Sequence, residues 1–126
     1  MKNYLLLLRR GELKLGSTDA EQRLFRDLAS WGESIAATQR LVAAERLVTD
    51  NRCRVRKSAE RLVIDGPFAE TRELVIGLFI IRAANIAEAA RLAGDCPAVK
   101  LGAEIEVREI ADSPSPEVLG PLDDAG

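Results

Sequence analysis

Short apolar runs along the chain predict its β-strands. Tyr4 to Leu8 is continuously apolar and is bounded by charged residues, which is typical of a buried strand. Two later segments, on either side of a polar turn at residues 57–60, predict a half-exposed hairpin. The predicted strands are residues 4–8, 41–49, 52–56, 61–64, 74–81 and 104–110.

Two stretches with helical spacing lie between these strands. Apolar residues recur every three or four positions across residues 19–38, which predicts an amphipathic helix with Trp31 in the core. Thr18 and Glu21 have the spacing of a capping box at its start. A shorter helix is predicted to begin at Asn85, whose side chain can cap it, and to end near Gly94.

The predicted order is β-α-β, an inserted hairpin, and then β-α-β again. This order is the ferredoxin-like split arrangement of the α+β class, an antiparallel sheet with two helices on one face. We expect one domain over residues 1–110. From residue 111 onward the chain is acidic and rich in proline, with no Lys or Arg after Asp112, which predicts a flexible acidic tail over residues 111–126.

The predicted central strands, residues 4–8 and 74–81, are apolar on both sides, because their odd- and even-numbered positions are apolar alike. Antiparallel strands usually alternate, since one face of the sheet meets water. Two helices can cover only one face of a small sheet, so the other face needs a different cover. We therefore expect a homodimer in which two copies pack through their open sheet faces.

Composition narrows the classes of function. The 126 residues include 18 Lys plus Arg and 20 Asp plus Glu, and the net charge of −2 argues against a nucleic-acid binder. The longest apolar run has eight residues, too short for a membrane span. The chain has no His, which excludes His-based nucleophiles, metal ligands and proton shuttles within the chain, and we expect no metal. It also lacks phosphate-cradling glycine loops, so no nucleotide cofactor is expected, and two Cys without a disulfide framework favour the cytoplasm.

The string Asp65-Gly66-Pro67-Phe68 is the most unusual local motif. One interpretation is structural, since Asp, Gly and Pro together favour a tight turn. The other is functional: the turn lines a pocket at a sheet end, with Asp65 and Glu70 as paired carboxylates for acid–base chemistry. Glu73 is a third acid nearby.

The basic cluster of the hairpin also has two interpretations. It can bind a phosphate or another anion, or it can be a solvated face that discourages edge-to-edge pairing of strands. Cys53 and Cys96 are both expected to be inert thiols. The cluster consists of Arg52, Arg54, Arg56, Lys57 and Arg61.

The stretch Asp65 to Thr71 resembles the DGPF group of the YCII-related family of small bacterial proteins. The resemblance covers about residues 1–110 and extends to the first strand and to the second half of the chain. The further segments that carry it are residues 1–7, 63–64, 77–81, Pro97, Gly102 and 106–108. The resemblance implies a dimeric ferredoxin-like α+β barrel with a cleft between the sheet and the partner subunit. It also implies a function that is mostly unassigned, with some members accompanying extracytoplasmic-function sigma factors.

The sequence departs from the family pattern at several positions. Relatives in the wider class that resemble enzymes use a His–Asp pair, and this chain has no His. Arg72 stands where the family has Lys, which keeps the charge but changes its hydrogen-bond geometry. Ile76 replaces the first of two glycines, Arg82 replaces an acid, and Leu92 lies where an aromatic is expected. These changes predict an altered or emptied pocket in an intact fold.

Three hypotheses of function follow. The first is a homodimeric small-molecule-binding or regulatory accessory domain without catalysis, whose ligand residues are Asp65, Phe68, Glu70, Thr71 and Arg82. The second is an isomerase- or hydrolase-like enzyme, with Asp65 or Glu70 as base and Arg82 or Arg46 stabilising charge in the dimer cleft. The third is a protein-interaction subunit linked to sigma-factor regulation, whose acidic tail contacts a basic partner.

Overall fold

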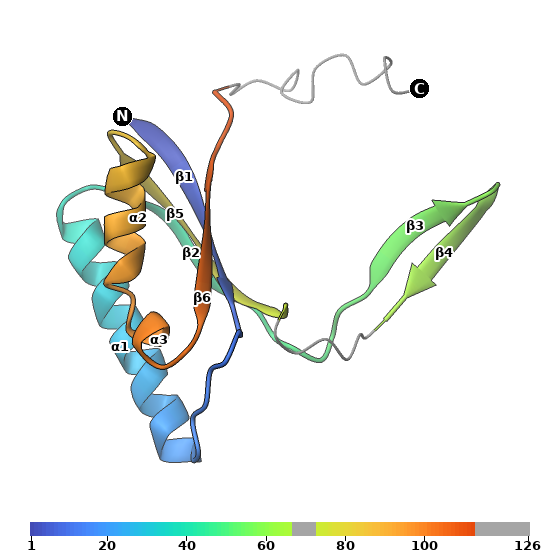
Figure 1. Cartoon of the computed structure of the whole chain (residues 1–126), viewed down its shortest axis with the longest axis horizontal. Coiled ribbons are helices and arrows are strands. Elements are labelled where there is room, and N and C mark those ends of the chain that lie inside the picture. Colours follow the sequence, from blue (N-terminus) through green and yellow to red (C-terminus); the bar gives the residue numbers. More distant parts are fainter. Residues whose placement is uncertain (67–72, 113–126) are drawn as a thin grey trace.

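The computed structural model describes residues 1–66 and 73–112 (Figure 1). Within these residues a four-stranded sheet is packed against helices, and a separate two-stranded hairpin extends away from it. The elements are β1 (Lys2–Arg9), α1 (Thr18–Ala37), β2 (Leu41–Arg46), β3 (Arg54–Ser58), β4 (Arg61–Asp65), β5 (Val75–Ala83), α2 (Ile86–Gly94), α3 (Pro97–Lys100) and β6 (Glu104–Glu109).

The two apolar strands β1 and β5 form the centre of the sheet, whose strand order in the described chain is β2-β5-β1-β6. All its pairings are antiparallel, and Leu6 lies between Phe79 of β5 and Val107 of β6. Alternation turns Leu6 and its neighbours Tyr4 and Leu8 toward one face, where all three are buried. The prediction of a buried first strand is confirmed.

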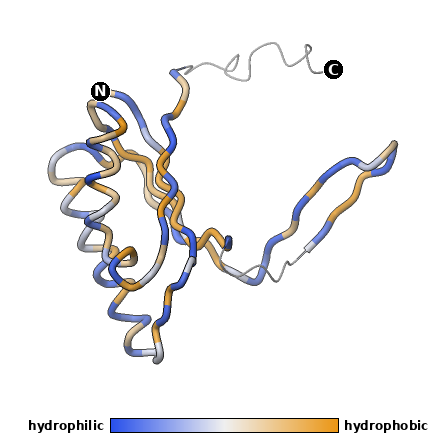
Figure 2. The backbone as a smooth tube through the Cα atoms, viewed as in Figure 1, coloured by the Kyte–Doolittle hydropathy of each residue, from blue (hydrophilic) through white to orange (hydrophobic). Residues whose placement is uncertain are grey.

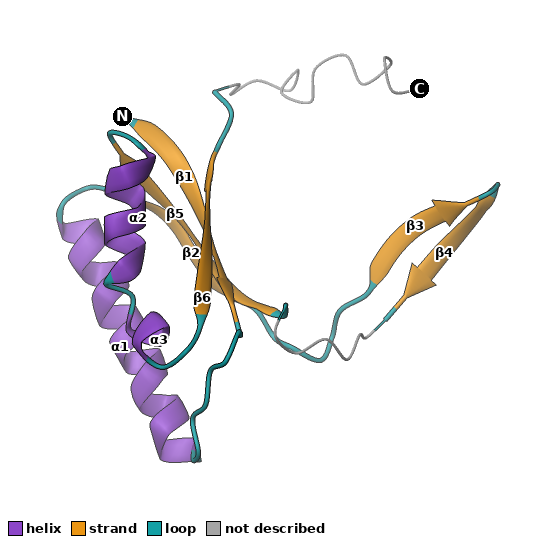
Figure 3. Cartoon of the chain, in the orientation of Figure 1, coloured by secondary structure: helices purple, strands orange, loops and turns teal. Residues whose placement is uncertain are grey.

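The helices of the described chain all lie against one face of the sheet (Figure 3). Trp31 of α1 meets Phe79 of β5 edge to face, with ring centroids 4.8 Å apart and an interplanar angle of 78°. This contact confirms Trp31 as a core residue. The helices and the sheet together form the ferredoxin-like α+β fold that the order of elements predicts.

The helix starts agree with the sequence at α2 and differ by one residue at α1. At α2, the Glu88 backbone N–H donates to Asn85 Oδ1 at 2.9 Å, so the predicted cap is confirmed. At α1 the cap is Ser17, whose Oγ accepts from the Ala20 backbone N–H at 3.1 Å. Thr18, the predicted cap, is already the first residue of the helix, because Ser17 is the last residue with extended backbone angles.

Other boundaries shift for local reasons. β2 ends at Arg46 rather than Thr49, because the chain leaves the sheet soon after the Leu47 N–H donates to the Ile76 carbonyl. The hairpin turn narrows to two residues, of which Ala59 has a φ of 55°. The short helix α3 is not predicted by periodicity; Pro97 at its start has the fixed φ that favours a first helical turn.

The other face of the sheet, called here the open face, carries no helix of the described chain (Figure 1). Its centre is apolar, because Leu7 lies opposite Leu78 and Leu5 lies opposite Ile80. The β3–β4 hairpin extends away on this side of the sheet and carries an apolar stretch of β4 (Figure 2). The strands β1 and β5 are therefore apolar on both sides because each side contributes to one face of the sheet. The helices of the described chain cover one of these two faces.

The position of the α1 cap gives a direct test. Replacing Ser17 by Ala removes the oxygen that satisfies the Ala20 N–H, and we expect a loss of about 1 kcal/mol in the free energy of unfolding. Thr18→Ala is the matched control, and it should cost clearly less. Chemical denaturation at one fixed protein concentration measures both. A larger loss for Thr18→Ala would place the cap where the sequence alone predicts it.

Candidate ligand-binding cleft

A cleft of about 600 Å³ lies at the root of the hairpin. Its walls come from the segment that leaves β2, from the start of β3, from the start of β5 and from the end of β1. Arg9, Arg52, Arg54 and Glu73 are its charged residues, and they give the cleft an excess of positive charge. A small anion is the ligand that such a lining favours.

Arg9 of β1 connects to two neighbouring segments, the strand β6 and the residues just before β5. Its Nη2 donates to Glu106 Oε1 of β6 at 2.8 Å, and its Nη1 donates to the Glu73 backbone carbonyl at 3.1 Å. The hydrogen bond with Glu106 raises the pKa of Arg9, and the same bond lowers the pKa of Glu106. Arg9 thus fixes the segment that enters β5 against β1 and β6.

Asp65, the first residue of the motif, is engaged within the hairpin. Its Oδ2 accepts a hydrogen bond from Arg56 Nε at 2.9 Å, which joins β4 to β3. This contact supports the structural interpretation of Asp65. The other predicted motif residues, Phe68, Glu70 and Thr71, lie outside the described residues, as does Arg72.

Gly66 connects the motif to the cleft. Its φ is +142°, and a Cβ at this position would lie 2.9 Å from the carbonyl oxygen of Arg52 and from Cys53 Cα. The backbone of Gly66 therefore packs directly against a cleft-lining segment, and any side chain there would collide with it. The motif therefore begins beside this cleft.

The structure places Arg82 far from the cleft at the hairpin root. Arg82 is near the end of β5, seven residues beyond the cleft-lining Val75, which corresponds to about 23 Å along the strand. Arg46, the other candidate for charge stabilisation, stacks on Phe25 of α1, with its guanidinium carbon 3.7 Å from the ring centroid. In the described chain, Asp65 is thus paired with Arg56 and Arg46 contacts Phe25.

The two thiols differ in environment. Cys96 is fully buried, and burial raises its pKa, although backbone hydrogen bonds from Ala98 and Val99 act in the opposite direction. The structure thus supports an inert Cys96, with burial as the cause. Cys53 is exposed and lines the cleft.

The described residues contain neither a metal cluster nor a membrane helix. No group of three His, Cys, Asp or Glu side chains in residues 1–66 and 73–112 is arranged to hold a metal ion. No helix in the same ranges is long and apolar enough to cross a membrane.

Sequence reasoning missed Arg9 as a residue of this cleft and named Glu73 only as a nearby acid. The available signal was the position of Arg9 at the end of the first strand. An arginine there can reach an acid of the paired last strand, but only the register of β1 with β6 shows that this acid is Glu106.

The mixed α+β architecture, with helices on one face of an antiparallel sheet and an inserted hairpin, defines a ferredoxin-like protein. The sequence pattern of the YCII-related domain matches residues 2–113, so the chain belongs to the YCII-related family. An uncharacterised protein of Rhizobium meliloti (strain 1021) is 37% identical over 81 residues. That match covers 63% of this chain and 65% of the relative, so the chain spans just under two thirds of the relative's length.

The Arg9–Glu106 pair predicts a pH-dependent stability. Because the folded state lowers the pKa of Glu106, its stabilising contribution is present at neutral pH and is lost as the pH falls below about 4 and through the lowered value. The difference in Tm between the wild type and Glu106→Gln should therefore be largest near neutral pH and shrink in acid. Glu104→Gln, on the same strand, is the control and should show a smaller effect. A difference that does not change with pH would contradict this assignment.

Proposed function

We propose that the protein is a homodimeric small-molecule-binding domain with a regulatory or accessory role and without catalysis, and that its ligand is a small anion bound at the root of the hairpin. The observation that carries this proposal is the apolar surface that a single chain leaves uncovered. That surface has two parts, the open face of the sheet and one face of the hairpin.

The open face has the organisation of a protein interface. Leu5, Leu7, Leu78 and Ile80 form its half-buried centre. Charged residues of the outer strands border it: Glu106 and Arg108 on β6, and Glu45 on β2. An apolar centre with a charged rim is typical of association between proteins, and two-fold symmetry allows one such face to cover its own copy.

The hairpin adds a second uncovered apolar surface. Val55 lies opposite Ile64 and Lys57 lies opposite Leu62, so three aliphatic side chains share one face. Val55, Ile64 and Leu62 are 58%, 63% and 69% exposed. An isolated two-stranded hairpin is at best marginally stable in water, so this face favours a partner surface. A second copy, approaching the open face on the side where the hairpin extends, supplies that surface.

The cleft lies where these two surfaces meet. Dimerisation would add a wall to it and exclude water, and lower polarity strengthens the attraction between the arginines and an anion. Carboxylates and phosphates both match the planar donor groups of arginine side chains such as Arg52 and Arg54.

The absence of catalysis is supported by the side chains near the cleft. The chain has no His, and two described acids, Asp65 of the motif and Glu106 of β6, act as charge partners. Asp65 binds Arg56, and Glu106 binds Arg9. Carboxylates paired in this way balance the charge of the arginines and hold them in position, and they are less suited to transferring protons.

The dimer is tested by mass in solution. Light scattering with gel filtration at micromolar concentration should give twice the chain mass of 13.7 kDa. Leu78→Glu places a charge at the centre of the open face and should shift the protein toward monomer. Ile86→Glu, which changes an exposed aliphatic residue at the start of α2, is the control and should leave the dimer intact. A monomeric wild type would refute the proposed assembly.

The ligand class is tested by thermal shift. In a screen of small carboxylates and phosphates that includes inorganic phosphate, at least one anion should raise the Tm of the wild type. Arg54→Gln should abolish that shift, because it removes a cleft cation. Arg61→Gln removes a hairpin cation outside the cleft and should keep the shift. If no anion stabilises the wild type, or if both variants respond equally, the anion site is wrong.

A further inference from the structure

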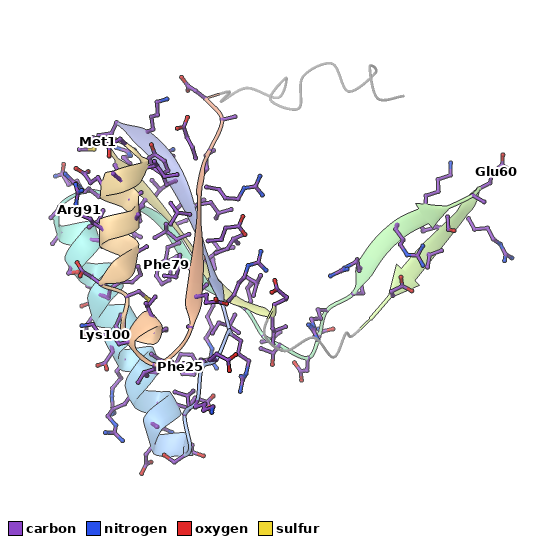
Figure 4. All side chains as sticks on the ribbon, viewed as in Figure 1. Met1, Phe25, Glu60, Phe79, Arg91 and Lys100 are labelled. Carbon is purple, nitrogen blue, oxygen red and sulfur yellow. The ribbon has the colours of Figure 1, made fainter. Side chains whose placement is uncertain are left out.

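A second cleft lies on the helix side of the sheet, between α1 and the strands β2 and β5. Its volume is about 400 Å³, which is within the range of small-molecule sites. The α1 wall is a single stripe of residues at helical spacing that runs from Phe25 to Ala36. Phe79 of β5 and Ala44 of β2 belong to the facing wall; Figure 4 labels Phe25 and Phe79.

Small residues line both walls of this cleft, so their side chains leave the space between the walls open. On α1 the stripe contains Ala29, Gly32 and Ala36, and the sheet presents Ala44 and Gly77. A Cβ added at Gly32 would be 3.9 Å from the nearest side-chain atom, in Phe79, so a larger residue would fit. A well-packed core would use larger side chains here, so this stripe of small residues favours a cleft that receives another molecule.

One cation lies at one end of this apolar cleft. The guanidinium carbon of Arg46 lies 3.7 Å from the centroid of the Phe25 ring, a cation–π contact that holds this head group at the cleft, and the N–H donors of a guanidinium lie in its plane. Planar N–H donors of this kind can hold a carboxylate through two parallel hydrogen bonds.

Two acids, Glu33 and Glu45, also line this cleft, and their placement leaves its Arg46 end positive. Glu45 lies opposite Leu78 in the sheet, so alternation turns its side chain toward the open face. Glu33 is eight residues beyond Phe25 on α1, about 12 Å along the helix. The charge pattern therefore complements a ligand with one anionic end and an apolar body.

We propose that this cleft binds a monocarboxylate with an apolar body, whose carboxylate pairs with Arg46 and whose chain or ring extends along α1 toward Ala36. The site lies on the opposite face of the sheet from the hairpin cleft and uses none of its residues. It therefore stands independently of the dimer and of the anion site proposed above.

Isothermal titration of the full chain with octanoate and with octan-1-ol tests this proposal, because the two probes share a chain and differ in charge. The wild type should bind octanoate more tightly than octan-1-ol. Arg46→Gln should weaken octanoate about tenfold or more and leave octan-1-ol unchanged, because a charge-assisted hydrogen-bond pair is lost. Equal affinity of the wild type and Arg46→Gln for octanoate would overturn the proposal, as would failure of the wild type to bind octanoate.

A pair of neighbouring substitutions locates the chain of the ligand. Ala36→Leu fills the cleft and should abolish binding of both probes, whereas Ala37→Leu changes an exposed residue outside the cleft and should preserve it. Circular dichroism and thermal melts check that both variants fold. Binding to a folded Ala36→Leu variant with wild-type affinity would overturn the assignment.

Discussion

The structure depends on a mismatch between the sheet and the helices that cover it. β1 and β5 are apolar on both faces, yet the helices of the described chain lie on one face only. Tyr4, Leu6 and Leu8 are buried beneath those helices, whereas Leu5 and Leu7 face the other way. Burying the first set forms the core, and the second set forms a surface that favours association.

This constraint also accounts for the location of both proposed sites. The hairpin is inserted between β2 and β5 and extends on the open-face side, so its root meets the arginine-lined cleft beside the surface expected to dimerise. The helix-covered face contains the second cleft, where small residues of α1 face Ala44 and Gly77. A two-sided sheet thus separates the arginine-lined cleft at the hairpin root from the largely apolar cleft beneath α1. Neither cleft requires a residue of the other.

The sequence predicts the fold well because its periodicity reports burial directly. Local spacing predicts the core position of Trp31, the helix caps near α1 and α2, and the strands that are apolar on both sides. The one-residue error at Ser17 reflects a choice between two adjacent hydroxyl residues. The sites are harder to predict. Arg9 and Glu106 meet only through strand register, and the length of β5 separates Arg82 from the hairpin-root cleft. The cleft beneath α1 depends on a tertiary distance that helical spacing does not encode.

The central claim is that a second copy covers the open face, and contacts between methyl groups of two protomers test it most directly. In a sample that mixes isotope-labelled and unlabelled protein, isotope-filtered NMR detects only contacts between different copies. The account predicts intermolecular contacts among the methyl groups of Leu5, Leu7, Leu78 and Ile80, and of hairpin residues such as Ile64. If the sample shows no such contacts, or if they arise only from the helix side, the account of the open face is contradicted.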